Sequence, residues 1–327
     1  MSKIKVFEAF AGYGGASFAL KKAKVQHEVV MFSEWDKWAK KLFMKNHGDI
    51  PLYGENGDIN KGDVSRIPEF DLFTGGFPCQ PFSSAGKGFG ELDPRGTLFY
   101  PILQIVDYHR PKHILLENVK GMTHKKHKPT LNKIIQTLEE LGYSVPEPQL
   151  LNSKDFGIPQ NRERLWIYAY HGKLPEGFNH APKKTKLKKT FQDFLDDKHG
   201  IEIPEYMYLS DNQIEVLLNK HNMPITEILN EDEALCLDIY NRKLKKDRVS
   251  ITLTEPHHNS LRVVEKNNNI ERGYTVRKLT VTEHYRLMGF REKELKTDNQ
   301  SYQQLCKRAG NGWDINVASR ILKKVLK

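Results

Sequence analysis

A cysteine in a stiff, polar loop is the first candidate for covalent chemistry. Cys79 lies in residues 74–83, TGGFPCQPFS, just beyond an expected strand and between two prolines. The prolines stiffen the loop, and open α/β sheets bind ligands where their strands end. This setting favours a thiolate nucleophile. Cys236 and Cys306 each stand next to leucine, and we expect them to be packing residues.

A carboxylate and two arginines are the candidates for acid–base chemistry. Glu117 ends an apolar run and begins the triplet ENV, and Arg162 and Arg164 lie in the segment QNRER. A carboxylate that emerges from a sheet into a crevice loses hydration, which raises its pKa and lets it hold or deliver a proton. Two interpretations stay open on the residues alone. Glu117 is either a proton donor or the partner of an arginine in a structural ion pair.

A glycine-rich turn is the candidate cofactor site. Residues 10–15, FAGYGG, follow an expected strand and precede a helical run, so the backbone can turn tightly beneath a ligand. Glu34 ends the next strand 22 residues after Gly12, where a Rossmann-like fold places a ribose-binding carboxylate, and Trp35 is suited to stacking on adenine. Ser17 stands where the dinucleotide motif has Gly or Ala. A nucleotide-like cofactor and an ordinary strand-to-helix turn therefore both remain open.

The elements that must position these residues follow an alternating pattern. Short β-branched or aromatic runs alternate with amphipathic helices, which predicts a doubly wound α/β domain with a mostly parallel sheet. We expect strands at 5–10, 28–32, 70–74, 113–116 and 165–170, and helices at 16–23, 131–141 and 316–326. The pattern breaks down after about residue 175, where we expect a separate, less regular domain.

Composition narrows the class of protein. The 327 residues suit about two domains, and their net charge is +10, gathered partly at residues 183–189 and 242–248. These basic clusters fit either a polyanionic partner or a solvated surface. No apolar run approaches the ~18 residues of a membrane span, and the start lacks a long apolar stretch, so we expect a cytoplasmic protein. Three widely separated cysteines exclude a disulfide framework and a CxxC metal site, and we expect no metal.

Taken together in chain order, these segments resemble the cytosine-5 DNA methyltransferase family. The matching stretches are residues 10–15, 76–80, 117–119, 160–164, 277–280 running to 288–290, and 310–311, and they span nearly the whole chain. The resemblance implies a Rossmann-like S-adenosylmethionine-dependent methyltransferase fold with a smaller, irregular target-recognition domain. It further implies a catalytic and cofactor-binding domain at 1–175, target recognition at 176–276, a hinge at 277–304 and a returning C-terminal helix at 305–327.

The resemblance also implies a mechanism. Cys79 would add to carbon 6 of a cytosine flipped out of duplex DNA, and Glu117 would act at nitrogen 3 of the ring. Arg162 and Arg164 would grip the cytosine carbonyl and the nearby DNA backbone. Carbon 5 would then take the methyl group, and loss of its proton would expel the cysteine. The implied DNA contacts are Gln80, Ser83 and Thr252.

For S-adenosyl-L-methionine, the resemblance places Phe10 and Trp35 on the adenine faces and Glu34 on the ribose. Asp58 and Asp63 compete for the adenine amino group, and Asp58 is preferred because it lies 21 residues before Cys79. The other implied cofactor residues are Gly12, Gly14, Pro78 and Asn311. One departure is that Gly312 and Trp313 follow Asn311, where the family usually has a small and then an aliphatic residue.

The leading hypothesis is a monomeric, site-specific methyltransferase that acts on double-stranded DNA in a bacterial or phage-infected cell and releases S-adenosylhomocysteine. A first alternative keeps the catalytic core but methylates transfer RNA. A second is a catalytically silent DNA-binding module. The roughly 100-residue irregular region favours duplex DNA, because reading a duplex requires a surface that reaches the major groove.

Overall fold

The computed structural model describes residues 3–77, 98–221, 225–256, 260–297 and 299–327. The expected nucleophile Cys79 lies outside these residues, together with Pro78, Gln80 and Ser83.

The larger sheet has seven strands among the described residues, and it confirms the predicted α/β fold. Its order is β2-β1-β3-β4-β7-β5, with β6 also paired to β7. The parallel strands are β1 (Ile4–Ala9), β2 (His27–Ser33), β3 (Leu72–Gly76) and β4 (His113–Val119). Against them, β7 (Glu163–His171) is antiparallel to β4, and β5 (Tyr143–Ser144) and β6 (Gln149–Asn152) are antiparallel to β7.

Two layers of helices cover this sheet, as the apolar run of β4 requires. Leu115 packs in the cluster that contains residues of α1 (Gly15–Lys22) and α8 (Ile315–Leu326). Ile114 and Leu116 point to the other face, where they pack with α3 (Phe99–His109) and α4 (Lys128–Glu140). Successive strand residues face opposite sides, so a continuous apolar run marks a strand that is covered twice.

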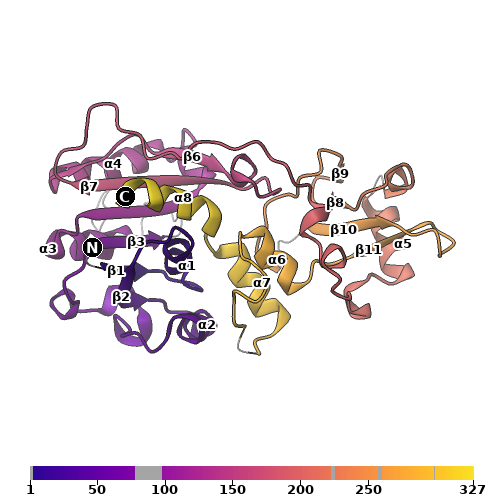
Figure 1. Ribbon diagram of the computed structural model, residues 1–327, viewed down its shortest axis with the longest axis horizontal. Helices are drawn as coiled ribbons and strands as arrows, with labels where there is room; N and C mark the ends of the chain where they lie inside the picture. Colours follow the sequence, from indigo (N-terminus) through magenta and orange to yellow (C-terminus); the bar gives the residue numbers. More distant parts are fainter. Residues whose placement is uncertain (1–2, 78–97, 222–224, 257–259, 298) are drawn as a thin grey trace.

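The C-terminal helix confirms the expectation at 316–326. Asp314 caps α8 by accepting the backbone N–H groups of Asn316 and Val317, and Val317, Ile321 and Leu322 form its buried stripe. The helix packs directly against α1, so the last helix of the chain lies beside the helix that follows the glycine-rich turn (Figure 1).

The second sheet makes the later part of the chain more regular than expected. Its four strands among the described residues are β8 (Leu235–Asp238), β9 (Lys243–Lys245), β10 (Leu261–Lys266) and β11 (Tyr274–Arg277), all antiparallel in the order β11-β10-β8-β9. With α5 (Asp211–His221) it encloses a core of its own that includes Leu235 and Val264. Helices α6 (Val281–Leu287) and α7 (Tyr302–Asn311) lie between the two sheets (Figure 1).

Within the described ranges, every helix is too short or too polar to cross a membrane. No group of three or more His, Cys, Asp or Glu side chains in those ranges is arranged to hold a metal ion.

Candidate active site

A cavity of about 740 Å³ opens where the four parallel strands end. Their carboxyl ends meet at one edge of the sheet, which brings distant parts of the chain together. The predicted site residues that line the cavity are Phe10, Gly12, Glu34, Trp35, Asp58, Glu117, Arg162, Arg164 and Asn311. Gly14 and Thr252 are not among the lining residues.

The glycine-rich turn is shaped by left-handed backbone conformations. Phe10, Gly12 and Gly14 have φ values of 51°, 59° and 86°. A Cβ atom on Gly14 would collide with the ring of His47 from α2 (Lys37–His47), whereas one on Gly12 would meet no atom within 4 Å. Gly14 therefore lets α2 pack beneath the turn, and Gly12 leaves its surface open to the cavity.

Glu8 holds the start of α1 and was missed by the sequence analysis. Its Oε1 accepts the backbone N–H of Ala16 at 3.0 Å, and its Oε2 accepts the hydroxyl of Ser17 at 2.6 Å. Burial raises the pKa of Glu8 to about 7, although these hydrogen bonds oppose the rise. The contact explains why Ser17 departs from the dinucleotide motif. A glutamate inside the apolar run KVFEAF was the available clue.

Glu34 joins the end of β2 to the glycine-rich turn. Its two carboxylate oxygens accept the backbone N–H groups of Gly12 and Asp36, each at 2.9 Å. Burial raises the pKa of Glu34, and the two backbone donors oppose that change. The neighbouring Trp35 is 79 % exposed while it lines the cavity, so its ring offers a large apolar face to a ligand.

The cavity separates the two competing aspartates. Asp58 lines it, and the Oδ1 of Asp58 accepts the backbone and side-chain N–H groups of Asn60, each at 3.0 Å. Asp63 instead caps the short turn Val64–Arg66 through Ser65 and is not among the lining residues. The geometry therefore favours Asp58.

Glu117 and Arg164 form an ion pair on the cavity wall. The Nε of Arg164 lies 2.9 Å from Oε1 of Glu117, and both side chains are largely buried. Burial raises the pKa of Glu117, while the positive charges of Arg164 and then Arg162 oppose the rise. The sequence left open whether Glu117 is a proton donor or an ion-pair partner of an arginine. The structure is compatible with both roles, because the ion pair lines the cavity.

Arg162 has a different set of partners from those expected. Its terminal nitrogens donate to the carbonyl groups of Leu253 at 3.1 Å, Gly310 at 3.1 Å and Gly312 at 2.7 Å. Burial and the charge of Arg164 lower its pKa to about 9. Arg162 thus joins its own segment to the segment of Leu253 and to the end of α7 at the edge of the cavity.

The same junction fixes the segment that contains Thr252. The hydroxyl of Thr252 donates to the carbonyl of Asn161 at 2.6 Å. The buried side chain of Gln160 accepts the N–H of Leu253 at 3.0 Å and donates to the carbonyl of Leu287 at 2.8 Å. Gln160, which was not predicted as a site residue, therefore ties this segment to α6.

Helix α7 supplies the remaining wall of the cavity. The amide of Asn311 donates to Glu255 at 2.6 Å, and both residues line the cavity. Arg308, also missed from the sequence, forms an ion pair with Asp36 at 2.7 Å, next to Trp35. The helix is therefore anchored on the strand end that carries the exposed indole.

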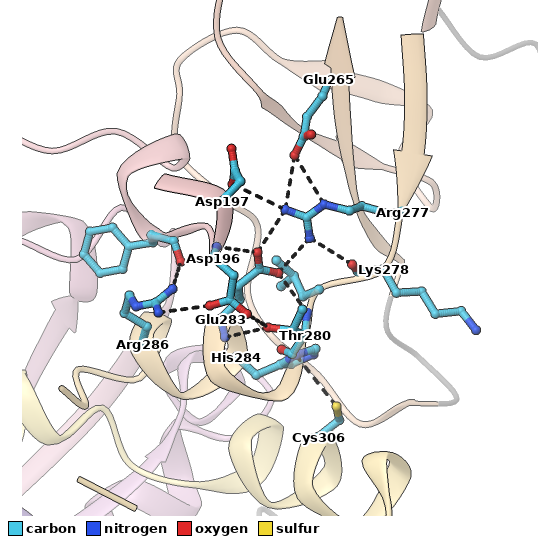
Figure 2. A network of polar contacts seen from close by, with 12 residues as sticks. Asp196, Asp197, Glu265, Arg277, Lys278, Thr280, Glu283, His284, Arg286 and Cys306 are labelled. Carbon is cyan, nitrogen blue, oxygen red and sulfur yellow. Dashed lines mark hydrogen bonds and ion pairs between the residues drawn. The ribbon is translucent and has the colours of Figure 1, made fainter. Parts of the chain in front are cut away.

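A buried charge network attaches the small sheet to α6 (Figure 2). The guanidinium of Arg277 contacts Glu283 at 2.8 Å and Glu265 at 3.1 Å. Thr280 and Glu283 form a reciprocal cap at the start of α6, and Arg286 pairs with Asp196 at 3.0 Å. The segment 277–290, singled out in the sequence, is thus a connector between the sheets.

The two basic clusters lie in different parts of the fold. Residues 242–248 extend from the end of β8 through β9, in the small sheet. The other cluster, 183–189, lies beside α8 in space. The side chain of Arg320 contacts that of Thr185 at 3.5 Å, and the side chain of Lys324 donates to the carbonyl of the nearby Ala181 at 2.7 Å. Several of these charges are paired with carboxylates, including Lys184 with Asp155 and Lys246 with Glu227. Only the cluster at 242–248 belongs to the small sheet.

Comparison with known proteins agrees with this architecture. A family model described as C-5 cytosine-specific DNA methylase matches residues 4–327. The chain is 40 % identical to the type II methyltransferase M.HpaII of Haemophilus parainfluenzae over 222 residues, which cover 67 % of this chain and 59 % of that protein. It is 34 % identical to M1.ScrFI of Lactococcus lactis subsp. cremoris, over 99 % of this chain and 78 % of that protein. Identity is also 34 % to M.HaeII of Haemophilus aegyptius, over 98 % and 92 %.

Solved structures share the fold at lower identity. The Dnmt2 methyltransferase of S. pombe superposes with a TM-score of 0.70 at 20 % identity, covering 99 % of this chain and 98 % of that one. A Spodoptera frugiperda DNMT2 mutant gives a TM-score of 0.73 at 20 % identity, covering 99 % and 100 %. The chain therefore belongs to the C-5 cytosine-specific DNA methylase family, and the family, fold and enzyme class expected from its sequence are confirmed.

Proposed function

We propose that this cytosine-5 DNA methyltransferase methylates carbon 5 of a flipped cytosine at a specific site in double-stranded DNA, with S-adenosylmethionine as the donor. The observation that carries this proposal is the single cavity in which the Glu117–Arg164 pair faces the residues suited to an adenosyl group. Its volume of about 740 Å³ lies in the range of about 300–1,000 Å³ that small-molecule sites occupy.

The lining residues fit S-adenosylmethionine. Phe10 and the exposed ring of Trp35 provide apolar faces for an adenine, while Glu34 and Asp58 provide acceptors for hydroxyl and amino groups. The open surface of Gly12 allows close approach of the ligand to the backbone. When bound, the cofactor supplies an electrophilic methyl group. Gly14 supports this site by shaping the turn, and Asn311 by holding Glu255 on the opposite wall.

Glu117 is the proposed proton donor to nitrogen 3 of the cytosine. Burial raises its pKa, which favours the protonated form that can donate to nitrogen 3 of cytosine. The Nε of Arg164 contacts Oε1 of Glu117, so we assign the contact with the base to Oε2. Protonation at nitrogen 3 makes carbon 6 electrophilic.

Cys79 remains the proposed nucleophile. Its thiolate adds to carbon 6, carbon 5 takes the methyl group, and loss of the carbon 5 proton then breaks the bond between carbon 6 and sulfur. In a crevice that carries the positive charges of Arg164 and Arg162, a thiolate would be favoured over a thiol. The carboxyl group and the thiol thus need opposite protonation states, which their surroundings must set.

DNA recognition is assigned to the region 176–276. Extruding a base costs a few kcal/mol, which contacts with the emptied duplex must offset. Within the basic cluster at 242–248 on the small sheet, Arg242 and Lys243 are exposed to solvent, and their charges are suited to neutralising phosphates. Thr252 lies on the adjoining segment, and we assign it, Gln80 and Ser83 to DNA contacts.

The test is methyl transfer from labelled S-adenosylmethionine to duplex DNA and to transfer RNA, compared for the wild type and Cys79→Ser. We expect label in duplex DNA alone, with none from the variant. Label in transfer RNA alone would favour the RNA alternative. Binding of DNA and cofactor without turnover would favour the silent module. Full activity of Cys79→Ser would contradict the assigned nucleophile.

A further inference from the structure

Trp313 occupies the space directly behind the catalytic carboxylate. It stands between the end of α7 and the start of α8, and its side chain is buried. The sequence is unusual here, because a bulky indole follows Gly312 where the family pattern has an aliphatic residue.

The indole covers a row of residues that crosses three strands. Gly76, Glu117 and Trp166 are register partners on β3, β4 and β7, so they share one face of the sheet. The ring of Trp313 packs edge-to-face on that of Trp166, with centroids 5.0 Å apart and planes at 77°. Trp313 therefore lies over the strand positions that carry the catalytic carboxylate.

Gly76 makes this approach possible. A Cβ atom on Gly76 would lie 2.9 Å from Nε1 of Trp313 and 3.4 Å from Oε2 of Glu117. The indole nitrogen and the carboxylate oxygen thus share the space that any other side chain at position 76 would fill. The other oxygen of Glu117 is the one that contacts Arg164. The carboxyl group is consequently bordered by an arginine on one side and by the indole on the other.

The backbone around Trp313 is held from two directions. The hydroxyl of Tyr13, in the glycine-rich turn, donates to the carbonyl of Trp313, and the carbonyl of Gly312 accepts from Arg162. A Cβ atom on Gly15 would lie only 3.0 Å from Cβ of Trp313. The indole is therefore fixed between the glycine-rich turn and the strand positions of Gly76, Glu117 and Trp166.

We propose that Trp313 is a positioning residue for Glu117, whose indole fills the space over Gly76 and keeps the carboxyl group in its pair with Arg164. The inference rests on the proposed role of Glu117. A smaller side chain would leave a void beside the carboxyl group, into which that group could rotate and which water could enter.

The pH dependence of the reaction reports this role. Glu117 is faced by Arg164 from β7, by Arg162 from the segment before it and by Tyr13 from the glycine-rich turn. A substitution at Trp313 leaves these three groups in place. It reduces the burial that raises the pKa of Glu117, so the alkaline limb of the rate profile moves to lower pH.

The test compares Trp313→Val, which restores an aliphatic residue, with Trp313→Phe, which keeps a ring, in single-turnover methyl transfer to duplex DNA across pH. We expect Trp313→Val to slow the transfer step about tenfold or more, with KM values for cofactor and DNA within roughly threefold of wild type. We expect Trp313→Phe to retain most of the rate. A Glu117→Gln variant identifies the limb that belongs to Glu117.

Leu322→Ala is the matched control, because Leu322 lies on α8 and is buried in the same hydrophobic cluster as Trp313. It should lower the melting temperature without moving the pH limb. A crystal structure of Trp313→Val should show the Glu117 carboxyl group displaced from Arg164, a readout that needs no turnover. An unchanged rate profile in Trp313→Val, or an unmoved carboxyl group in its crystal structure, overturns the inference. A fall in the methyl-transfer rate of Trp313→Val that equals the fall in Leu322→Ala at every pH also overturns it. If Trp313→Val does not fold, Trp313→Leu takes its place, and an unchanged pH limb together with an unmoved carboxyl group in that variant overturns the inference. Absence of methyl transfer by the wild type would instead contradict the proposed function.

Discussion

The Nε of Arg164 lies 2.9 Å from Oε1 of Glu117, while the neighbouring Arg162 donates to three backbone carbonyls. Two arginines only two positions apart therefore have different tasks. Arg164 orients the carboxyl group for which we propose the catalytic role, and Arg162 joins the segments that enclose the cavity. Substitutions should separate these tasks.

Replacing Arg164 should impair chemistry more than folding. Arg164→Met keeps the aliphatic stem but removes the charge that opposes the raised pKa of Glu117, so the alkaline limb of the rate profile should move to higher pH. We expect the single-turnover rate to fall about 10²-fold, the lower end of the range for lost acid–base catalysis. Arg162→Met is the comparison. It leaves three buried carbonyls without their donor, and should lower the free energy of unfolding by about 2–4 kcal/mol. Equal losses of stability in the two variants would contradict this division.

The buried Glu8 should make stability depend on pH. Its pKa is about 7 in the folded protein against an ordinary value of 4.5, so the folded state binds the proton more tightly than the unfolded state does. This favourable contribution is fully present below pH 4.5 and is lost as pH rises to 7. The loss amounts to about 3 kcal/mol by linkage.

Glu8→Gln should remove that dependence, because the amide cannot ionise. Urea denaturation of the variant and the wild type at pH 5 and pH 8 measures the difference. From pH 5 to pH 8, the free energy of unfolding of the variant should rise relative to that of the wild type. A difference between the two proteins that stays constant with pH would show that Glu8 does not titrate in this range.

The glycine-rich turn offers a matched pair of substitutions. Gly14→Ala places a Cβ atom against the ring of His47 at a φ of 86°, and it should destabilise the fold by about 2–3 kcal/mol. Gly12→Ala meets open space at a φ of 59°, so its cost should be nearer 1 kcal/mol. Its main effect should be weaker binding of S-adenosylmethionine, measured by calorimetry. Unchanged cofactor affinity in Gly12→Ala would place the ligand elsewhere.

The competing aspartates can be separated in the same way. Asp58→Asn should weaken cofactor binding about tenfold, because a neutral amide oxygen replaces a charged acceptor of the hydrogen bond from the adenine amino group. Asp63→Asn should leave the affinity unchanged, because Asp63 does not line the cavity. The opposite result would transfer the role to Asp63.

The contact between α7 and the end of β2 should matter for the cofactor more than for the methyl-transfer step. Arg308→Gln breaks the ion pair with Asp36, beside Trp35, and should raise the KM for S-adenosylmethionine about fivefold to tenfold with little change in kcat. Lys307→Gln removes the same charge one position earlier and keeps the ion pair, so it is the control. A similar rise in both variants would show that charge alone is responsible.

The sequence predicted the parts of the site that lie at strand ends. Glu34 and Glu117 follow apolar runs, and parallel strands bring such ends to one edge, so their meeting could be expected from local pattern. The small sheet was harder to foresee, because its strands are only three to six residues long and contain charged residues such as Lys243 and Arg262.

The roles and partners that the sequence did not predict depend on contacts between distant segments. Arg162 bonds to Gly310 across 148 positions, and Gln160 to Leu287 across 127. Arg308 finds its partner Asp36 only because the C-terminal helices return to the first half of the chain. No local periodicity records such a contact, so these roles became visible only in the folded chain.

The most direct test of the whole account is bisulfite sequencing of DNA from cells that express the wild type or Glu117→Gln. We expect protected cytosines at one recurring duplex sequence with the wild type, and protection reduced at least 10²-fold with the variant. Absence of protected cytosines with the wild type, or equal protection with Glu117→Gln, would contradict it.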